Sequence, residues 1–245
     1  MSAVYRSPEG EREVLRRYRE LLDRWPVPAE HLRVPTSEGE TFVVSGGPAD
    51  APPVVLLHGS STNSAVWLGD VPHWAPHLRL YAVDMVGEPG LSAQSRPALG
   101  SDAPARWLGD VLDGLGLKRA ALVGASLGGW FALDFATRHP ERVERLALIC
   151  PGGIGRQKVG AVLPALLLRP FGRWGQRASM RFALGPGLPE DAAEFLDYIA
   201  LVQRHFRPRV EPLPVFGDDA LRRLTMPVLA VMGERDRMLD SHGTR

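Results

Sequence analysis

The sequence predicts an α/β protein with a mostly parallel central sheet and helices on both of its faces. From Val54 onward, short apolar runs alternate with helical patterns, as in parallel sheets whose strands are joined by right-handed helical crossovers. A Gly-x-Ser-x-Gly pattern at residues 124–128 stands between one such run and a helix. The 245 residues are enough for one large domain with a sizeable core.

Composition and charge exclude several classes of protein. Apolar residues make up 44% and charged residues 23%, with a formal net charge of +1, so nothing points to nucleic acid as a partner. No stretch is long and apolar enough for a membrane span. Cys150 is the only cysteine and the N-terminus shows no signal segment, so we expect a reducing, cytoplasmic location.

The first quarter of the chain predicts a helix and a β-hairpin. Ser7 and Pro8 suit the N-cap and first position of a helix, and apolar residues at 14–25 follow helical spacing on one face. The runs at 31–35 and 41–45 are strand-like and are separated by a glycine-containing turn, which favours a hairpin.

Five further apolar runs predict the buried strands of the sheet, at 54–57, 78–83, 119–123, 143–149 and 227–232. Helical patterns lie between the first four of these runs, at 64–74, 101–115 and 130–138. Strand and helix therefore alternate, as parallel pairing requires.

The Gly-x-Ser-x-Gly pattern has a mechanical explanation centred on Ser126. A tight strand-to-helix turn forces this serine into a strained conformation, while Gly124 and Gly128 leave room where strand and helix meet. The helix N-terminus places the Leu127 N–H beside the reacting oxygen. The pattern thus predicts a nucleophile elbow; the alternative is a glycine-rich turn whose serine only caps the helix.

Other polar residues follow the predicted strands, so parallel pairing brings them to one edge of the sheet. We expect the Ser60 N–H, with Ser61 as the fallback, to be the second oxyanion donor beside Leu127. Asp236 follows the last strand and is the candidate catalytic acid, with Asp240 as the alternative on the same loop. An aspartate such as Asp84 more often holds a turn than takes part in chemistry.

The alternation stops after the fourth buried strand, which suggests three regions. Residues 1–150 are expected to hold the N-terminal helix and the first part of the core, 151–224 a helical cap or lid, and 225–245 the return to the core. Large apolar side chains in the cap either line a pocket or form the cap's own core: Leu166, Phe171, Trp174, Phe182, Phe195 and Phe206.

These motifs together resemble the α/β-hydrolase family, and within it bacterial carboxylesterases of the naproxen-esterase type. The residues that carry the resemblance are Pro53-Val54-Val55-Leu56-Leu57-His58-Gly59, Tyr81-Ala82-Val83-Asp84 with Gly87, Gly124-Ala125-Ser126-Leu127-Gly128-Gly129, His139-Pro140-Glu141-Arg142-Val143 and Gly233-Glu234-Arg235-Asp236. The resemblance implies hydrolysis of a small ester through an acyl-enzyme, without a cofactor. A serine at the elbow differs from the aspartate of dehalogenases and epoxide hydrolases of this fold.

This sequence departs from the family pattern at the catalytic base. Typical element lengths put the base histidine roughly 20–30 residues past Asp236, whereas the sequence ends at Arg245. His58 is expected to support the oxyanion turn, and His242 and His205 are poorly placed to serve as the base. The remaining histidines are expected on the surface or on helix faces: His31, His73, His77 and His139.

Three explanations of this departure stay open: a C-terminally shortened esterase, a natural binding protein that does not turn its ligand over, and recruitment of a nearby histidine. A missing final strand and helix would expose a sheet edge, so we expect reduced stability or a homo-oligomer paired along that edge. The expected function is a serine hydrolase of the carboxylesterase kind. The alternatives are a catalytically silent binding protein and a thioester or carbon–carbon bond hydrolase.

Overall fold

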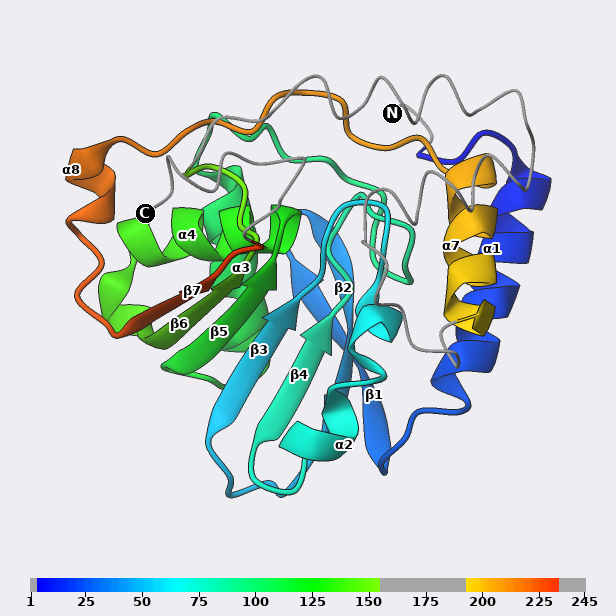
Figure 1. Ribbon diagram of the computed structural model, residues 1–245, viewed down its shortest axis with the longest axis horizontal. Coiled ribbons are helices and arrows are strands. Elements are labelled where there is room, and N and C mark those ends of the chain that lie inside the picture. The colour runs from blue at the N-terminus through cyan, green and yellow to red at the C-terminus, as the bar shows by residue number, and fades with distance from the viewer. Residues whose placement is uncertain (1–3, 155–192, 234–245) are drawn as a thin grey trace.

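The computed structural model describes residues 4–154 and 193–233, which form an α/β fold around one seven-stranded sheet (Figure 1). The strand order is β1-β2-β4-β3-β5-β6-β7. The strands are β1 (Ala29–Thr36), β2 (Gly39–Gly46), β3 (Pro53–Leu57), β4 (Arg79–Val83), β5 (Ala120–Ala125), β6 (Val143–Ile149) and β7 (Val228–Val231). The predicted hairpin is the antiparallel pair β1–β2, β2 is antiparallel to β4, and all pairs from β3 to β7 are parallel, which confirms the predicted sheet.

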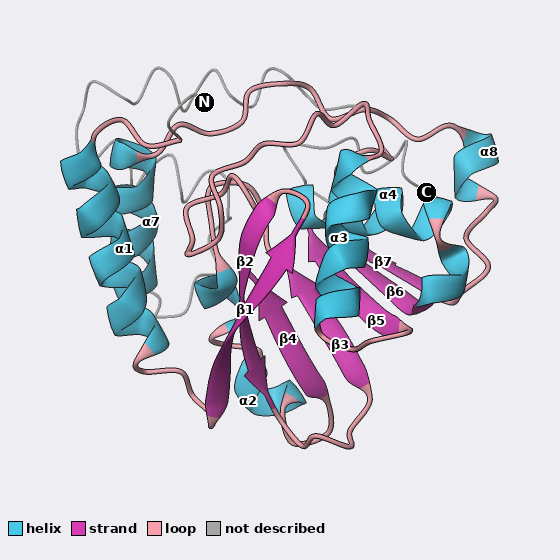
Figure 2. Cartoon of the chain, turned by 180° about the vertical axis from the view of Figure 1, so that it is seen from behind, coloured by secondary structure: helices cyan, strands magenta, loops and turns pink. Residues whose placement is uncertain are grey.

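Helices lie on both faces of this sheet, as predicted (Figure 2). The helical elements are α1 (Pro8–Leu22), η1 (Ser64–Trp67), α2 (Val71–Trp74), α3 (Ala103–Gly114), α4 (Leu127–Arg138), η2 (Pro140–Arg142), α7 (Ala193–His205) and α8 (Asp218–Leu221). One expectation was wrong: the helix expected at 64–74 is two short pieces. Gly69 lies in the break and Pro72 cannot donate a backbone hydrogen bond to the preceding turn, so a continuous helix is disfavoured there.

The buried strands are apolar throughout because the sheet has a hydrophobic core on each face. In β3, Val55 and Leu57 join the core under α3 and α4, whereas Val54 and Leu56 join the core that contains α1. All four side chains are at least 94% buried, which explains why β3 shows no alternation of apolar and polar residues.

Helix α7, which follows the undescribed residues 155–192, packs against α1 on one face of the sheet (Figure 1). The ring of Tyr198 stacks on that of Tyr18 with centroids 6.4 Å apart, and Glu194 forms ion pairs with Arg17 and Arg24. Phe206, just after α7, is buried against Tyr5 and therefore belongs to the core.

Phe195 is partly buried against the same core. The other four apolar residues expected in the cap lie outside the described residues: Leu166, Phe171, Trp174 and Phe182. The three-region division of the chain stays a prediction.

The chain after α7 crosses over the carboxyl ends of the strands before it reaches α8 (Figure 1). The Trp130 indole N–H donates to the Pro214 carbonyl at 2.8 Å, and the Phe216 N–H donates to the Gly153 carbonyl at 2.8 Å. These bonds attach the crossing segment to α4 and to the loop after β6. Residues from distant parts of the sequence thus meet at this edge.

Strand β7 stands at the end of the described sheet. Leu229 is 62% exposed and Val231 is 50% exposed, and β6 is the only described strand that pairs with β7. Among the described residues β7 is an edge strand, and both reduced stability and pairing with a second copy stay predictions. No helix within residues 4–154 or 193–233 has the length and hydropathy needed to cross a bilayer.

Candidate active site

Ser126 occupies the sharp turn between β5 and α4. Its backbone has φ 50° and ψ −108°, a conformation that non-glycine residues rarely adopt. Its N–H donates to the Ile149 carbonyl at 2.9 Å, and its carbonyl accepts from the Trp130 and Gly152 N–H groups, each at 3.1 Å. The end of β6, the loop after it and the first turn of α4 therefore hold Ser126 in this rarely populated conformation.

The two glycines of the motif are required by close backbone contacts. A Cβ on Gly124 would lie 2.5 Å from the Gly128 carbonyl oxygen, and a Cβ on Gly128 would lie 2.2 Å from the Leu57 carbonyl oxygen. Both distances are far below van der Waals contact. The structure thus confirms the expectation that these positions leave room where strand and helix meet.

The turn after β3 lies directly beside Ser126. A Cβ on Gly59 would come within 3.6 Å of the Ser126 Cβ, because the β3–β5 register sets Leu57 opposite Gly124. Among the described residues, the N–H groups of Ser60 and Leu127 donate to no acceptor. The Ser61 N–H is engaged, since it donates to a carboxylate oxygen of Glu88 at 2.6 Å.

His58 is fully buried and fixes this turn. Its Nδ1–H donates to the Gly59 carbonyl at 2.9 Å, and its Nε2 accepts from the Met85 N–H at 2.9 Å. These partners define a neutral imidazole with the proton on Nδ1, and burial lowers the pKa of His58. With both nitrogens engaged, His58 supports the turn, as expected, and has no free nitrogen for Ser126.

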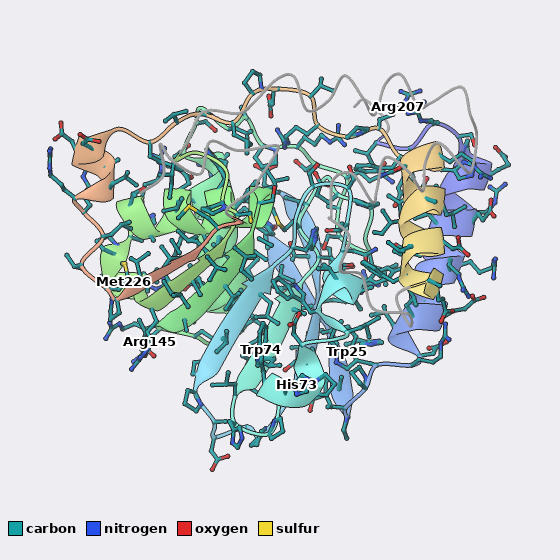
Figure 3. The ribbon with its side chains drawn as sticks, in the orientation of Figure 1. Trp25, His73, Trp74, Arg145, Arg207 and Met226 are labelled. Atoms are coloured by element: carbon teal, nitrogen blue, oxygen red, sulfur yellow. The ribbon has the colours of Figure 1, made fainter. Side chains whose placement is uncertain are left out.

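The other described histidines lie away from Ser126. His205 contacts α1 at Gly10 and Glu13, and His31 packs on Phe42. His73 lies on α2, near the amino end of β4 (Figure 3). The remaining two are His77, in the turn before β4, and His139, at the far end of α4 roughly 20 Å from Ser126 by helix rise.

Asp84 has a structural part in the site, as its turn position suggested. Oδ1 accepts hydrogen bonds from the Tyr18 hydroxyl, the Ser64 N–H and the Ser64 hydroxyl, at 2.7, 3.0 and 2.7 Å. Oδ2 accepts from the Leu91 N–H at 2.8 Å. With four donors on one buried carboxylate, Asp84 joins α1 to the loops after β3 and β4. Asp236, Asp240 and His242 lie outside the described residues.

Sequence reasoning missed two polar residues of this region. Asn63 donates to the Pro89 carbonyl at 2.7 Å and to the Tyr198 hydroxyl at 2.5 Å, which links the turn after β3 to α7. Glu88 is 3% exposed, and burial raises its pKa to about 7. The available signal was an acidic residue in a glycine-flanked turn that follows a buried strand.

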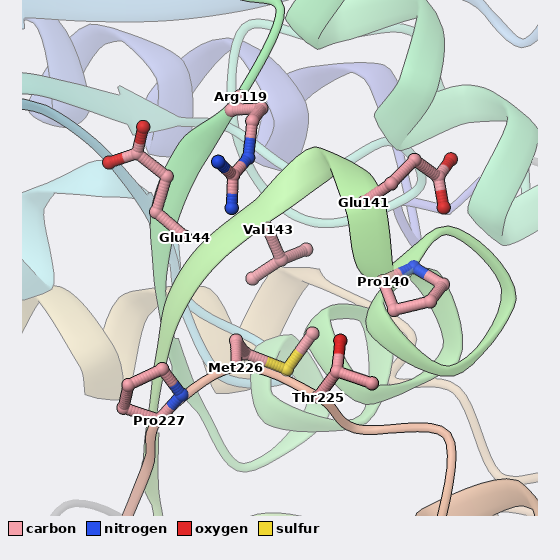
Figure 4. A pocket seen from close by; sticks show the side chains of 8 residues that line it. All are labelled: Arg119, Pro140, Glu141, Val143, Glu144, Thr225, Met226 and Pro227. Carbon is pink, nitrogen blue, oxygen red and sulfur yellow. The ribbon is translucent and has the colours of Figure 1, made fainter.

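A separate open pocket lies at the opposite, amino edge of the sheet (Figure 4). It is lined by Arg119, Pro140, Glu141, Val143, Glu144, Thr225, Met226 and Pro227. The lining has no serine or cysteine nucleophile, and Ser126 is at the other end of β5. Ser126 therefore does not belong to this pocket.

A mostly parallel sheet with a strained serine between a buried strand and a helix is typical of the α/β-hydrolase class of protein. Residues 52–170 match the sequence profile of the family described as "alpha/beta hydrolase fold". The chain is also 30% identical over 247 aligned positions to the uncharacterized carboxylesterase nap of Bacillus subtilis (strain 168), covering 92% of this chain and 77% of that protein. The chain therefore belongs to the α/β-hydrolase family.

Two further comparisons place the chain near bacterial carboxylesterases. It is 33% identical to carboxylesterase YbfK of Bacillus subtilis (strain 168), over 90% of this chain and 76% of that protein. The crystal structure of naproxen esterase (carboxylesterase NP) from Bacillus subtilis superposes with a TM-score of 0.84 and 29% identity, covering 97% of this chain and 85% of that chain. These relatives support a hydrolase of the esterase kind.

Proposed function

We propose that the protein is a serine hydrolase that cleaves a small carboxylic ester through an acyl-enzyme on Ser126. The main support is the strained backbone of Ser126 at the junction of β5 and α4, beside two N–H groups that have no acceptor among the described residues. Similarity to carboxylesterases supports an ester as the substrate class.

In the proposed reaction, Ser126 Oγ attacks the ester carbonyl carbon and the carbonyl electron pair moves to oxygen. The Ser60 and Leu127 N–H groups donate to this oxyanion. Collapse expels the alcohol, which takes up the proton that the Ser126 hydroxyl gave to the base, and leaves the acyl group on Ser126. Water then attacks the acyl carbon and releases the acid. Ser61 is the weaker choice as a donor because Glu88 already accepts its N–H.

The proton transfers need a base, which Asp236 is proposed to orient, with Asp240 as the alternative. None of the six histidines in the described parts of the chain has a hydrogen bond or ring contact to Ser126. This observation favours a second candidate function: a protein that binds an ester in the same site without turning it over.

Covalent labelling and turnover distinguish the two candidates. We expect a fluorophosphonate to modify Ser126, located by peptide mass spectrometry, and a short p-nitrophenyl ester to be hydrolysed. If the base is weak or absent, added imidazole should raise ester turnover by the wild type and not by Ser126→Ala. The Ser126→Ala sample also measures the hydrolysis that imidazole causes by itself.

Ser101→Ala, a serine in the loop before α3, is the matched control and should behave like the wild type. Wild-type protein that is neither labelled nor rescued by imidazole would exclude the esterase and favour the binding protein.

A further inference from the structure

Glu88 lies in the turn after β4, and its carboxylate reaches the turn after β3. It is 3% exposed, and its Oε2 accepts the Ser61 N–H at 2.6 Å. Among the described residues this is the only hydrogen bond of its carboxylate. Asp84, four residues earlier, has four donors, so the two buried acids have different surroundings. A buried carboxylate with one donor is costly to keep, which calls for a specific reason.

The bond from Ser61 fixes a residue that is itself strained. Ser61 has φ 59°, in the left-handed region. On the other side of Ser60, the Gly59 carbonyl accepts from the His58 Nδ1–H at 2.9 Å and from the Thr62 hydroxyl at 2.7 Å. Ser60 thus lies between two anchored residues, and its own N–H donates to no described acceptor. Without the Glu88 bond, one of these anchors is lost.

The charged and titratable groups around Glu88 come from three segments. Arg96 lies in the loop after β4, Arg209 in the segment after α7, and Tyr5 in the segment before α1. Burial raises the pKa of Glu88 to about 7, while the Ser61 N–H and the two guanidinium groups oppose the rise. Burial, with nearby carboxylates that include Glu88, also raises the pKa of Tyr5, so Tyr5 stays neutral as Glu88 titrates. Glu88 is therefore the group that changes charge near neutral pH.

We propose that ionised Glu88 is the positioning residue of the turn at residues 58–62, holding Ser61 so that the Ser60 N–H faces the Ser126 side. The inference rests on the proposed function, because Ser60 is an oxyanion donor only if Ser126 is the nucleophile. Protonation of Glu88 weakens the bond to Ser61 and lets its left-handed backbone relax. Hydrolysis should then decline on the acidic side for a reason separate from the base.

Two variants and one control test this proposal. Glu88→Gln keeps the shape and a neutral acceptor but removes the charge, whereas Glu88→Ala removes the acceptor. Asp134→Asn is the control, because Asp134 is also a buried acid with a raised pKa, but it bonds Arg138 towards the far end of α4. The amide resonances of Ser60 and Ser61 are followed by NMR from pH 5 to 9, together with kcat, KM and the rate of Ser126 phosphonylation.

We expect the Ser61 amide resonance of the wild type and of Asp134→Asn to shift with a midpoint near pH 7, and that of Glu88→Gln to stay constant. Loss of a well-placed oxyanion donor costs about 100-fold or more in kcat. The kcat of Glu88→Ala should therefore fall by about that factor, with KM nearly unchanged. The kcat of Glu88→Gln should fall less. Its pH profile should lack the part of the decrease at acidic pH that protonation of Glu88 causes.

A Ser61 amide that does not titrate in the wild type, or variants that react at the wild-type rate with the same pH profile, would overturn the inference. If Glu88→Ala does not fold, Glu88→Gln decides, since its side chain has the same shape. A wild type that shows the amide titration but no reaction at Ser126 would refute the proposed function and leave the anchoring of the turn intact.

Discussion

The two edges of the parallel sheet differ in which residues adopt left-handed backbone conformations. At the carboxyl edge, three residues other than glycine have positive φ: Ser61, Ser126 and Cys150, with φ of 59°, 50° and 44°, after β3, β5 and β6, in addition to Gly87 and Gly153. At the amino edge, the turns before β3 and β5 use Gly47 and Gly116, with φ of 89° and 71°. Glycine adopts these angles without a steric penalty, whereas another residue in such a region costs on the order of 1–3 kcal/mol.

The two edges also differ in whether their charged side chains are buried or exposed. The carboxyl edge buries Asp84 and Glu88, at 0% and 3% exposed. The amino edge carries solvated ion pairs such as Arg142–Asp113, whose aspartate side chain is 69% exposed, and the open pocket of Figure 4. The strained non-glycine residues and the two buried acids of the strand-end loops therefore lie at one end of the sheet, where the proposed chemistry lies. The amino edge keeps relaxed turns and exposed charges.

The largest expected effect comes from closing the space at the elbow. Gly128→Ala would place a Cβ 2.2 Å from the Leu57 carbonyl oxygen, so α4 and β3 would have to separate. We expect a loss of more than about 3 kcal/mol in the free energy of unfolding, or a fall in Tm of about 6–12 °C, measured by thermal and chemical denaturation. Gly100→Ala, with no atom within 4 Å of the added Cβ, is the control. An equal Tm for the two variants would show that α4 and β3 separate easily enough to accommodate the Cβ.

The sequence was enough to predict the sheet, the elbow and the family because these depend on local patterns. The run at Val54–Leu57 is apolar on both faces, and Gly124, Ser126 and Gly128 stand at a fixed spacing between a strand and a helix. The helix expected at 64–74 failed where Gly69 and Pro72 outweighed the apolar spacing.

The contacts of Glu88, Asn63 and Tyr198 could not be predicted from the sequence. Glu88 bonds a residue 27 positions away, and Asn63 bonds Tyr198 at a separation of 135. No periodicity encodes such a pairing, because it depends on how loops from different strands meet above the sheet. An acidic residue in a turn is usually exposed, so its type alone did not indicate burial.

A smaller effect concerns pH and the buried Glu88. Its pKa is raised from 4.5 to about 7 on folding, so between these pH values the folded state binds a proton that the unfolded state has lost. Stability contributed by Glu88 therefore falls as pH rises from about 4.5 to 7 and is constant above that. The shift corresponds to about 3 kcal/mol at most.

The measurement is the free energy of unfolding by urea at pH 5 and pH 8. Between pH 5 and pH 8, the free energy of unfolding of Glu88→Gln should rise by up to about 3 kcal/mol relative to that of the wild type. Glu144→Gln removes an exposed carboxylate at the amino edge and should stay within about 0.5 kcal/mol of the wild type at both values. A constant difference between Glu88→Gln and the wild type would show that Glu88 is not destabilising when ionised.

The smallest effect compares strain alone at the two edges. The Ser126 side chain makes no capping hydrogen bond, so Ser126→Gly should stabilise the fold by about 1 kcal/mol, since glycine tolerates φ 50°. Gly116→Ala has open space around its Cβ but φ 71°, so it should destabilise the fold by a similar amount. Chemical denaturation gives the change in the free energy of unfolding for each variant. A gain for Ser126→Gly and a loss for Gly116→Ala would establish that the backbone of Ser126 is strained in the native protein. A loss for both variants would show that the serine side chain stabilises the elbow conformation.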